Sequence, residues 1–311
     1  MLKKIISTLF VLFLTISVSA YFLLNPEKKQ LDKTTRIALG GTYIQLAKGI
    51  THYSLKRPLT GHTAEKPVVL IHGGTIPMWT WDEQVRALTD AGFTVLTYDQ
   101  YGRGYSDRPD TDYDQALYLE QLAELIKKLD IDQPFDLIGL SLGGGTAVNF
   151  AAQNPEKVDK LILISPVICD FKTSTIFKIP VLGEFIARVA GVGVIVKRFK
   201  HLLKDNDDLE KYTKLFIEQT TYKGFERSIL SMVRNDAMGD YSSAYKKVGD
   251  LAIKTLLVRG TQDTEITEDM IKKIKHLIPE IEYRPVDDTG HGIVFQKGDI
   301  VNKLILDFLN P

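Results

Sequence analysis

Leu137-Ile138-Gly139-Leu140-Ser141-Leu142-Gly143-Gly144-Gly145 decides the fold, because this stretch places one serine between two glycines where an apolar strand is expected to meet a helix. The spacing G-x-S-x-G is typical of a serine on a sharp turn that pushes its hydroxyl out of the sheet. Such a turn leaves no room for bulky neighbours, and Gly139 and Gly143 meet that requirement. The pattern predicts that Ser141 is a nucleophile, provided that an acid and then a histidine follow it along the chain.

A glycine-rich turn at the start of a helix also suits a bound phosphate, because backbone N–H groups point toward the anion there. The spacings G-x-x-x-x-G-K-[ST] and G-x-G-x-x-G, which mark nucleotide-binding turns, are absent from this stretch. The nucleophile interpretation of Ser141 is therefore favoured. The missing fingerprint also argues against a dinucleotide-dependent oxidoreductase.

Short apolar runs alternate with helix-like segments on both sides of Ser141, after an opening hairpin near residues 43–53. The predicted strands are 67–71, 93–98, 135–140 and 161–164, and the predicted helices are 81–91, 113–129 and 142–153. Such alternation requires a parallel sheet covered by helices on both faces. We therefore predict an α/β fold with a mostly parallel, doubly wound sheet.

The alternation stops over residues 167–250 and resumes with the strand 254–260. We interpret 167–250 as a helical cap inserted over the carboxyl ends of the strands, where open α/β sheets bind ligands. The core is then expected in two parts, 37–166 and 251–311. The second part is completed by predicted helices at 268–277 and 299–309 and a strand at 282–285.

The base that Ser141 requires is predicted to be His291, which lies between two glycines after the last predicted strand. None of the other five histidines has that late, glycine-flanked position, and the alternative is a solvated loop histidine. A general base of this kind takes the serine proton and later returns it to the leaving group. No spacing of histidines suggests a metal site.

The acid is predicted to be Asp263, which follows the strand 254–260 after a short turn. From there its carboxylate would hold the imidazole in the required tautomer. Glu265, Asp287 and Asp288 are competitors close by in the sequence, and a solvated loop acid is the remaining alternative. The resulting order of serine, aspartate and histidine agrees with the requirement stated for Ser141.

Acyl transfer also requires hydrogen-bond donors for the negative oxygen of the tetrahedral intermediate. The backbone N–H of Leu142, at the expected helix start, is one predicted donor. The second is assigned to Gly74, with its neighbour Thr75 as the alternative, in the turn that follows the strand 67–71.

Five pieces of the chain together resemble one known family. They are Val69-Leu70-Ile71-His72-Gly73-Gly74, Asp99-Gln100-Tyr101-Gly102-Arg103-Gly104-Tyr105-Ser106, the serine turn, Gly260-Thr261-Gln262-Asp263 and Gly290-His291-Gly292. In this order they are similar to α/β-hydrolase-fold serine hydrolases of the lid-bearing esterase and lipase kind, over residues 66–311. The resemblance implies a structural role for His72. It assigns no chemical role to residues 99–106.

The resemblance implies a carboxylic-ester hydrolase that forms an acyl-enzyme and needs no metal or organic cofactor. The same fold also serves carbon–carbon bond hydrolases, peptidases and non-catalytic binding proteins, and fold alone does not decide among them. Serine at position 141 disfavours the dehalogenases and epoxide hydrolases of this fold, which use aspartate there.

The substrate is expected to be a small-molecule or lipid ester. Thr75, Met78 and Trp79 are candidates for its pocket, although core packing explains the last two equally well. The cap carries many apolar residues, which suit either an acyl chain or ordinary burial: Phe171, Ile176, Phe177, Ile179, Val181, Leu182, Phe185, Ile186 and 192–196. A cap resting on a membrane and taking lipid esters from it is a further hypothesis.

Balanced charge argues against nucleic-acid binding, because 39 basic and 39 acidic residues create no net field. The single cysteine, Cys169, excludes an internal disulfide and is interpreted as apolar packing. The sequence does not indicate an oligomeric state.

Within residues 1–24, Lys3 and Lys4 precede an almost uncharged run over residues 5–24, which is about long enough for a membrane-spanning helix. We predict an uncleaved anchor, with a cleaved signal peptide as the alternative. The flanking lysines would place the catalytic domain outside the cytoplasm, and a cleaved leader would leave it secreted or periplasmic. Residues 25–36 are polar and are predicted to be a linker.

Overall fold

In the computed structural model, which describes residues 1–58, 66–169, 174–204 and 206–310, eight strands form one sheet in the order β1-β2-β4-β3-β5-β6-β7-β8. The strands are β1 (Thr42–Leu46), β2 (Gly49–Lys56), β3 (Pro67–Ile71), β4 (Thr94–Tyr98), β5 (Phe135–Leu140), β6 (Val158–Ile164), β7 (Lys254–Gly260) and β8 (Glu282–Val286). The opening hairpin β1–β2 and its junction with β4 are antiparallel, whereas all other neighbours are parallel. The predicted mostly parallel α/β sheet is confirmed.

The central strands are buried on both faces, which explains their continuous apolar runs. Alternate residues of β3 point to opposite sides, so Val69 and Ile71 belong to one core cluster and Val68 and Leu70 to the other. The first cluster is completed by α4 (Gln115–Lys128), α5 (Leu142–Gln153), α10 (Ser242–Asp250) and α11 (Glu268–Leu277), and the second by α3 (Asp82–Asp90) and α13 (Gly298–Leu309). Two short elements, η2 (Pro155–Lys157) and α12 (Ile293–Gln296), lie in the connections.

The sheet brings four segments that carry predicted site residues to one edge. Because neighbouring parallel strands end at the same edge, the turns after β3, β5, β7 and β8 lie beside one another. These turns carry Gly74, Ser141, Asp263 and His291, respectively. Residues 150 positions apart can therefore come into contact at this edge.

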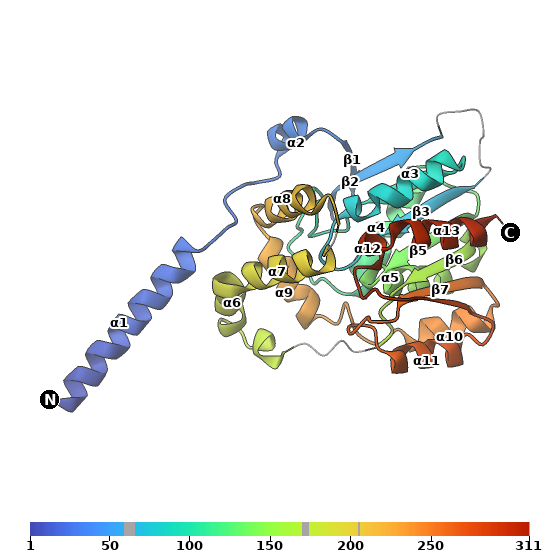
Figure 1. Ribbon diagram of the computed structural model, residues 1–311. Coiled ribbons are helices and arrows are strands. Elements are labelled where there is room, and N and C mark those ends of the chain that lie inside the picture. Colours follow the sequence, from blue (N-terminus) through green and yellow to red (C-terminus); the bar gives the residue numbers. More distant parts are fainter. Residues whose placement is uncertain (59–65, 170–173, 205, 311) are drawn as a thin grey trace.

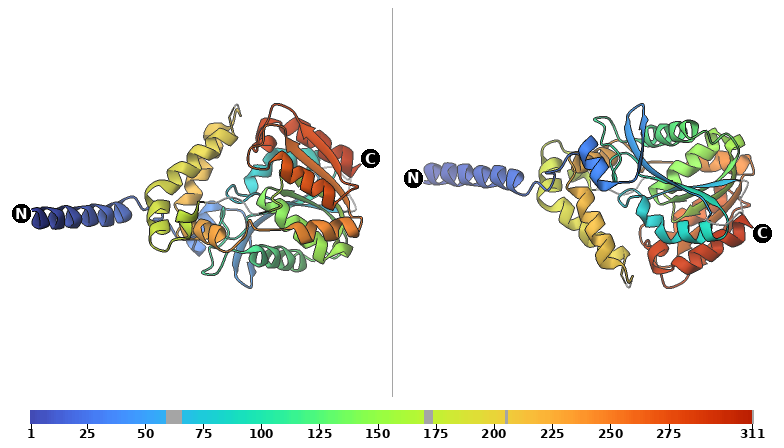
Figure 2. Two further views of the ribbon diagram at one scale, coloured as in Figure 1. Left: turned by 90° about the horizontal axis from the view of Figure 1, so that it is seen from below. Right: turned by 90° about the horizontal axis from the view of Figure 1, so that it is seen from above.

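Between β6 and β7 the described chain forms a set of helices, here named the β6–β7 helices. They are η3 (Thr175–Lys178), α6 (Leu182–Ile186), η4 (Ala187–Gly191), α7 (Val192–Leu202), α8 (Leu209–Thr220), α9 (Phe225–Arg234) and α10. Figures 1 and 2 show α6, α7, α8 and α9 gathered at the end of the molecule from which the N-terminal helix projects. The last member, α10, instead lies in the layer against the sheet, because Tyr245 and Val248 are buried with α5 and α11.

The N-terminal helix α1 (Leu2–Leu23) projects away from the rest of the molecule (Figures 1 and 2). The predicted membrane anchor is wrong, because no helix within the described residues is long and apolar enough to cross a bilayer. Polar side chains recur along α1, and they are Lys3, Lys4, Ser7, Thr8, Thr15, Ser17 and Ser19. The localisation outside the cytoplasm and the membrane contact were both deduced from that anchor and lose their basis with it.

Residues 25–36 contact the rest of the chain at several points. The Glu27 carboxylate accepts hydrogen bonds from the backbone N–H groups of Gly224 and Glu226, at the start of α9. Lys29 forms a parallel bridge with Tyr222. The next helix, α2 (Lys33–Leu39), is capped by Asp32, whose carboxylate accepts a hydrogen bond from the N–H of Thr35.

Candidate active site

Ser141 lies between β5 and α5 with φ 53° and ψ −118°, in a backbone region that non-glycine residues rarely adopt. The two flanking glycines are required by close backbone contacts. A Cβ atom on Gly139 would lie 2.3 Å from the carbonyl oxygen of Gly143, and one on Gly143 would lie 2.3 Å from that of Ile71. The turn can therefore form only with glycine at both positions.

We expect Gly139→Ala to destabilise the protein by about 1–3 kcal/mol, because backbone atoms cannot move aside as a flexible side chain can. Gly193→Ala in α7 is the matched control, since a Cβ there meets nothing within 4 Å. That change should be neutral or slightly stabilising, because alanine has a higher helix propensity than glycine. Urea unfolding of both variants measures the difference, and equal midpoints would contradict the argument.

The three residues predicted to act together are in hydrogen-bond contact. His291 Nε2 lies 3.1 Å from Ser141 Oγ, and His291 Nδ1 lies 2.9 Å from Asp263 Oδ2. The Asp263 side chain is buried and that of His291 is nearly so, whereas Ser141 is partly exposed. One imidazole therefore bridges a hydroxyl that solvent can reach and a carboxylate that it cannot.

Asp263 is held in place by its own loop. Its Oδ1 accepts hydrogen bonds from the backbone N–H groups of Glu265 and Ile266, at 2.9 and 3.0 Å. Burial works to raise the pKa of Asp263, but the hydrogen bond and charge interaction with His291 and the N–H of Ile266 together hold that pKa below its usual value. The carboxylate is therefore ionised where it faces the imidazole.

The competing acids lie in different environments. Asp287 and Asp288 are exposed. Glu265 approaches His291 from the other side, with Oε2 3.5 Å from Nε2, the ring nitrogen that faces Ser141. Arg198 of α7 binds both oxygens of that carboxylate, at 2.7 and 2.5 Å. Glu265 is thus occupied by an ion pair with a β6–β7 helix, which the sequence did not reveal.

The turn after β3 lies directly beside Ser141. A Cβ on Gly73 would lie 3.5 Å from the Cβ of Ser141, and one on Gly74 would lie 3.5 Å from Cδ2 of Leu142. Within the described part of the chain, no hydrogen bond uses the backbone N–H of Gly74, Thr75 or Leu142. These N–H groups are therefore available to a ligand at Ser141.

A cavity of about 520 Å³ opens at Ser141 and runs under the β6–β7 helices. Thr75, one of the candidate pocket residues, lines it together with Gly74 and Leu142. Most of its wall is apolar, including Phe177, Ile186, Ile195, Ile229 and Met232. Arg198, Glu226 and Glu265 are the charged residues of the lining, and Glu226 is paired with Arg188.

Several predicted pocket residues lie away from this cavity. Trp79, in the 3-10 helix η1 (Met78–Trp81), stacks on Tyr212 with ring centroids 5.1 Å apart, which is core packing. The backbone N–H of Met78 donates a hydrogen bond to the carboxylate of Asp99 at 2.8 Å. Val181, from the apolar part of the predicted cap, is 81% exposed, and Phe171 lies outside the described residues.

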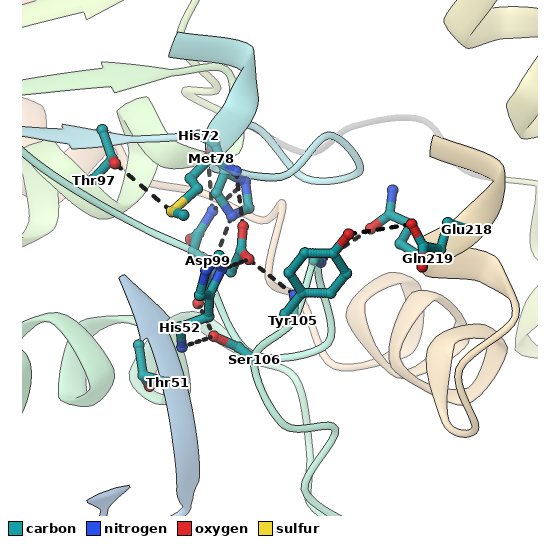
Figure 3. Close-up of polar contacts among 12 residues, drawn as sticks. Thr51, His52, His72, Met78, Thr97, Asp99, Tyr105, Ser106, Glu218 and Gln219 are labelled. Atoms are coloured by element: carbon teal, nitrogen blue, oxygen red, sulfur yellow. Dashed lines mark hydrogen bonds and ion pairs between the residues drawn. The ribbon is translucent and has the colours of Figure 1, made fainter. Parts of the chain in front are cut away.

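Residues 99–106 form a buried polar network beside the turn after β3 (Figure 3). The Asp99 carboxylate is 2.7 Å from His52 Nδ1, and it also accepts a hydrogen bond from the N–H of Tyr105 at 2.9 Å. The Ser106 hydroxyl donates to the carbonyl oxygen of Asp99 and accepts from the N–H of His52. This stretch therefore joins β2 to the predicted oxyanion turn, which accords with the structural interpretation of His72 and its surroundings.

His72 is fully buried, and burial lowers the pKa of its imidazole to about 4. The unfolded chain binds a proton below about pH 6.5, whereas the folded one does so only near 4. Acidification through this window therefore favours unfolding, by about 1.4 kcal/mol per pH unit. We expect His72→Gln to flatten the pH dependence of the free energy of unfolding between pH 6.5 and 4, as denaturant titrations would measure. An unchanged slope would contradict this assignment.

A family model for the alpha/beta hydrolase fold matches residues 66–185. The chain is 25% identical over 255 residues to AB hydrolase superfamily protein YisY of Bacillus subtilis (strain 168), covering 79% of this chain and 92% of that protein. It is 26% identical over 220 residues to 2-hydroxymuconate semialdehyde hydrolase of Pseudomonas putida, covering 69% and 76%. The enol-lactonase structure from Burkholderia xenovorans LB400 superposes with a TM-score of 0.72 at 21% identity, over 87% of this chain and 100% of that one.

The sheet order, the strained serine turn and these similarities agree with one another. The fold is the α/β-hydrolase fold, as the five motifs predicted, and the chain is similar in sequence to members of that superfamily. The similar proteins include a 2-hydroxymuconate semialdehyde hydrolase and an enol-lactonase, so similarity by itself does not name the reaction of this chain.

Proposed function

We propose that this protein is a serine hydrolase that cleaves carboxylic esters with an apolar group next to the carbonyl. The observation that carries the proposal is the pair of contacts made by His291, 3.1 Å from Ser141 Oγ and 2.9 Å from Asp263. A serine hydroxyl is a weak nucleophile unless a base in contact with it accepts its proton. His291 has the position of that base, and Asp263 the position of the group that orients it.

In the proposed reaction, Ser141 Oγ attacks the ester carbonyl carbon while its proton passes to His291 Nε2. The Nδ1–H of His291 donates to Asp263, whose negative charge stabilises the imidazolium that forms. The carbonyl oxygen becomes an oxyanion and accepts hydrogen bonds from the N–H of Leu142 and from that of Gly74 or Thr75. One such donor is worth about 2.7–4 kcal/mol in the transition state.

The tetrahedral intermediate collapses when His291 gives its proton to the leaving alcohol, which leaves an acyl group on Ser141. A water molecule then loses a proton to His291 Nε2 and attacks the acyl carbon through the same oxyanion contacts. Collapse of the second intermediate returns the proton to Ser141 and releases the acid. Apart from the substrate and one water molecule, the proposed steps need only Ser141, His291, Asp263 and the N–H groups proposed as oxyanion donors.

The cavity supports an apolar acyl group. Its walls offer aliphatic and aromatic side chains from Phe177, Ile195, Ile229 and Met232, and it begins at the nucleophile. A volume of about 520 Å³ accommodates a medium-length chain or a ring, as pockets for small ligands do. Transfer of each buried CH₂ from water contributes about 0.8 kcal/mol, so kcat/KM should rise with chain length until the cavity is full.

A panel of p-nitrophenyl esters from acetate to laurate tests the ester proposal directly. We expect measurable turnover of the esters and the highest kcat/KM at intermediate length. The panel should also contain an enol-lactone and a 2-hydroxymuconate semialdehyde, because proteins similar to this chain bear the names of those activities. Turnover of either of these in the absence of ester turnover would replace the proposal by that chemistry. No turnover and no covalent labelling of Ser141 would favour a binding protein.

A further inference from the structure

The turn after β3 is held by three side chains that bind three consecutive carbonyl oxygens. The oxygen of Gly73 accepts from His72 Nδ1 at 2.7 Å, that of Gly74 from Arg103 Nε at 2.5 Å, and that of Thr75 from Gln219 Nε2 at 2.9 Å. This turn lies between β3 and η1, outside both elements, so neither a strand ladder nor a helix fixes it. Its geometry therefore depends on these side chains.

Each of the first two bonds orients one candidate oxyanion donor. In a planar trans peptide the C=O and the following N–H point in opposite directions. Fixing the Gly73 carbonyl thus fixes the N–H of Gly74, and fixing the Gly74 carbonyl fixes the N–H of Thr75. His72 can donate from Nδ1 because its Nε2 accepts the backbone N–H of Gln100 at 2.9 Å.

Gln219 differs from the other two side chains because it comes from the β6–β7 helices, at the end of α8. Its side chain is buried, and both the nitrogen and the oxygen of its amide form hydrogen bonds. Nε2 donates to the Thr75 carbonyl, while Oε1 accepts the backbone N–H of Gly104 at 3.1 Å. Gly104 follows Arg103, the residue that holds the Gly74 carbonyl. One amide therefore connects the turn to the loop that also supports it.

Other contacts hold this end of α8 against the same loop. The Tyr105 hydroxyl donates to the Glu218 carboxylate at 3.2 Å, and Figure 3 shows Glu218 and Gln219 facing the Tyr105 side of the loop. Arg103 also donates from Nη1 to the Ser228 hydroxyl of α9 at 2.7 Å. The geometry of the turn after β3 thus depends on where α8 and α9 lie, because buried hydrogen bonds connect both helices to the turn or to Arg103, which holds it.

We propose that Gln219 is a positioning residue for the oxyanion hole, so that the β6–β7 helices set the geometry of the N–H groups that stabilise the transition state. This inference rests on the proposed serine hydrolase function. Loss of the donor to the Thr75 carbonyl would free the Thr75–Ile76 peptide, which directly follows the peptide that carries the Thr75 N–H. Arg103, through the Gly74 carbonyl, would then be left to hold the Thr75 N–H from one side only. The oxyanion would then meet a less firmly held donor at Thr75, whereas the apolar walls from Phe177, Ile195 and Ile229 would be unchanged.

The test compares Gln219→Glu and Gln219→Met with the unaltered protein. Glutamate keeps the size and can still accept from Gly104. Because burial favours the neutral acid, its rates are measured at a pH high enough to ionise it, where the carboxylate cannot donate to Thr75. Methionine loses both bonds. With a fluorophosphonate probe, whose phosphoryl oxygen occupies the oxyanion position, we expect the maximal rate of Ser141 modification to fall about 10-fold or more in both variants, and the concentration for half-maximal rate to stay within about twofold. The kcat on the best ester should fall by a similar factor at constant KM.

Ser231→Ala is the matched control. Its hydroxyl also ties a β6–β7 helix to the core, by accepting the N–H of Tyr113 at 3.0 Å, but it does not touch the turn after β3. We expect its modification rate to be unchanged. Normal rates in Gln219→Glu, or a loss confined to probe affinity, would overturn the proposal. If Gln219→Met does not fold, the glutamate variant decides alone.

The outcome also separates this inference from the proposed function. If the unaltered protein carries no covalent adduct on Ser141 after treatment with the probe, the serine hydrolase proposal itself fails. If it is modified and the Gln219 variants are modified equally fast, only the positioning role fails.

Discussion

Ser141→Ala is expected to lower kcat by about 10⁶-fold. It should also abolish labelling by a fluorophosphonate, because the probe forms its covalent bond with the Oγ atom that the variant lacks. Losses of that size accompany removal of the nucleophile in a serine protease, and the remaining rate comes from the oxyanion donors and from binding. Removing the hydroxyl also removes one hydrogen bond from His291 and leaves a small space beside Gly73. The fold should therefore be retained.

Three measurements check this prediction. Ester turnover gives the loss in kcat, intact-protein mass spectrometry gives the adduct, and circular dichroism confirms the fold. Ser242→Ala, at the partly exposed start of α10, is a control in which turnover and labelling should be unchanged. Retention of more than about one-thousandth of the turnover in a clean Ser141→Ala preparation would mean that a different residue carries the reaction.

The residues that could be found from sequence are those whose chemistry depends on local geometry. Gly139 and Gly143 indicate a turn with no room for a Cβ atom. In the structure, a Cβ at either position would lie only 2.3 Å from a backbone carbonyl oxygen. The alternation of apolar strands and helices likewise predicts a parallel sheet, because helices must cover both faces of such a sheet. From these two local signals the edge carrying Ser141, Asp263 and His291 follows, since parallel strands end together.

The residues that could not be found act across long separations with no local pattern. Gln219 donates to the carbonyl oxygen of Thr75, which is 144 positions away in the sequence. Arg198 binds Glu265 from a helix whose position over the sheet cannot be predicted from the periodicity of its residues. The N-terminal run does have a clear local pattern, but the prediction drawn from it is wrong. The apolar composition of residues 1–24 predicts a membrane span, yet no helix within the described residues is long and apolar enough to cross a bilayer.

Asp263→Asn is expected to lower kcat by about 10⁴-fold with a smaller effect on KM. The carboxylate accepts the Nδ1–H of His291, which leaves Nε2 free to take the proton of Ser141. An asparagine at this site would present its amide N–H to Nδ1, because its oxygen is drawn to the N–H groups of Glu265 and Ile266. The imidazole would then carry its proton on Nε2 and could not act as the base.

Glu265→Gln is the decisive control, because Glu265 is the other carboxylate within reach of the imidazole. It faces the wrong nitrogen for an orienting acid and is bound to Arg198, so its loss should change kcat by less than about tenfold. Asp287→Asn should have no effect, since that residue is exposed. If Glu265→Gln were as damaging as Asp263→Asn, the imidazole would have to turn during the reaction to use Glu265, and the orienting role would pass to that residue. Turnover of the two variants on a single ester decides between these geometries.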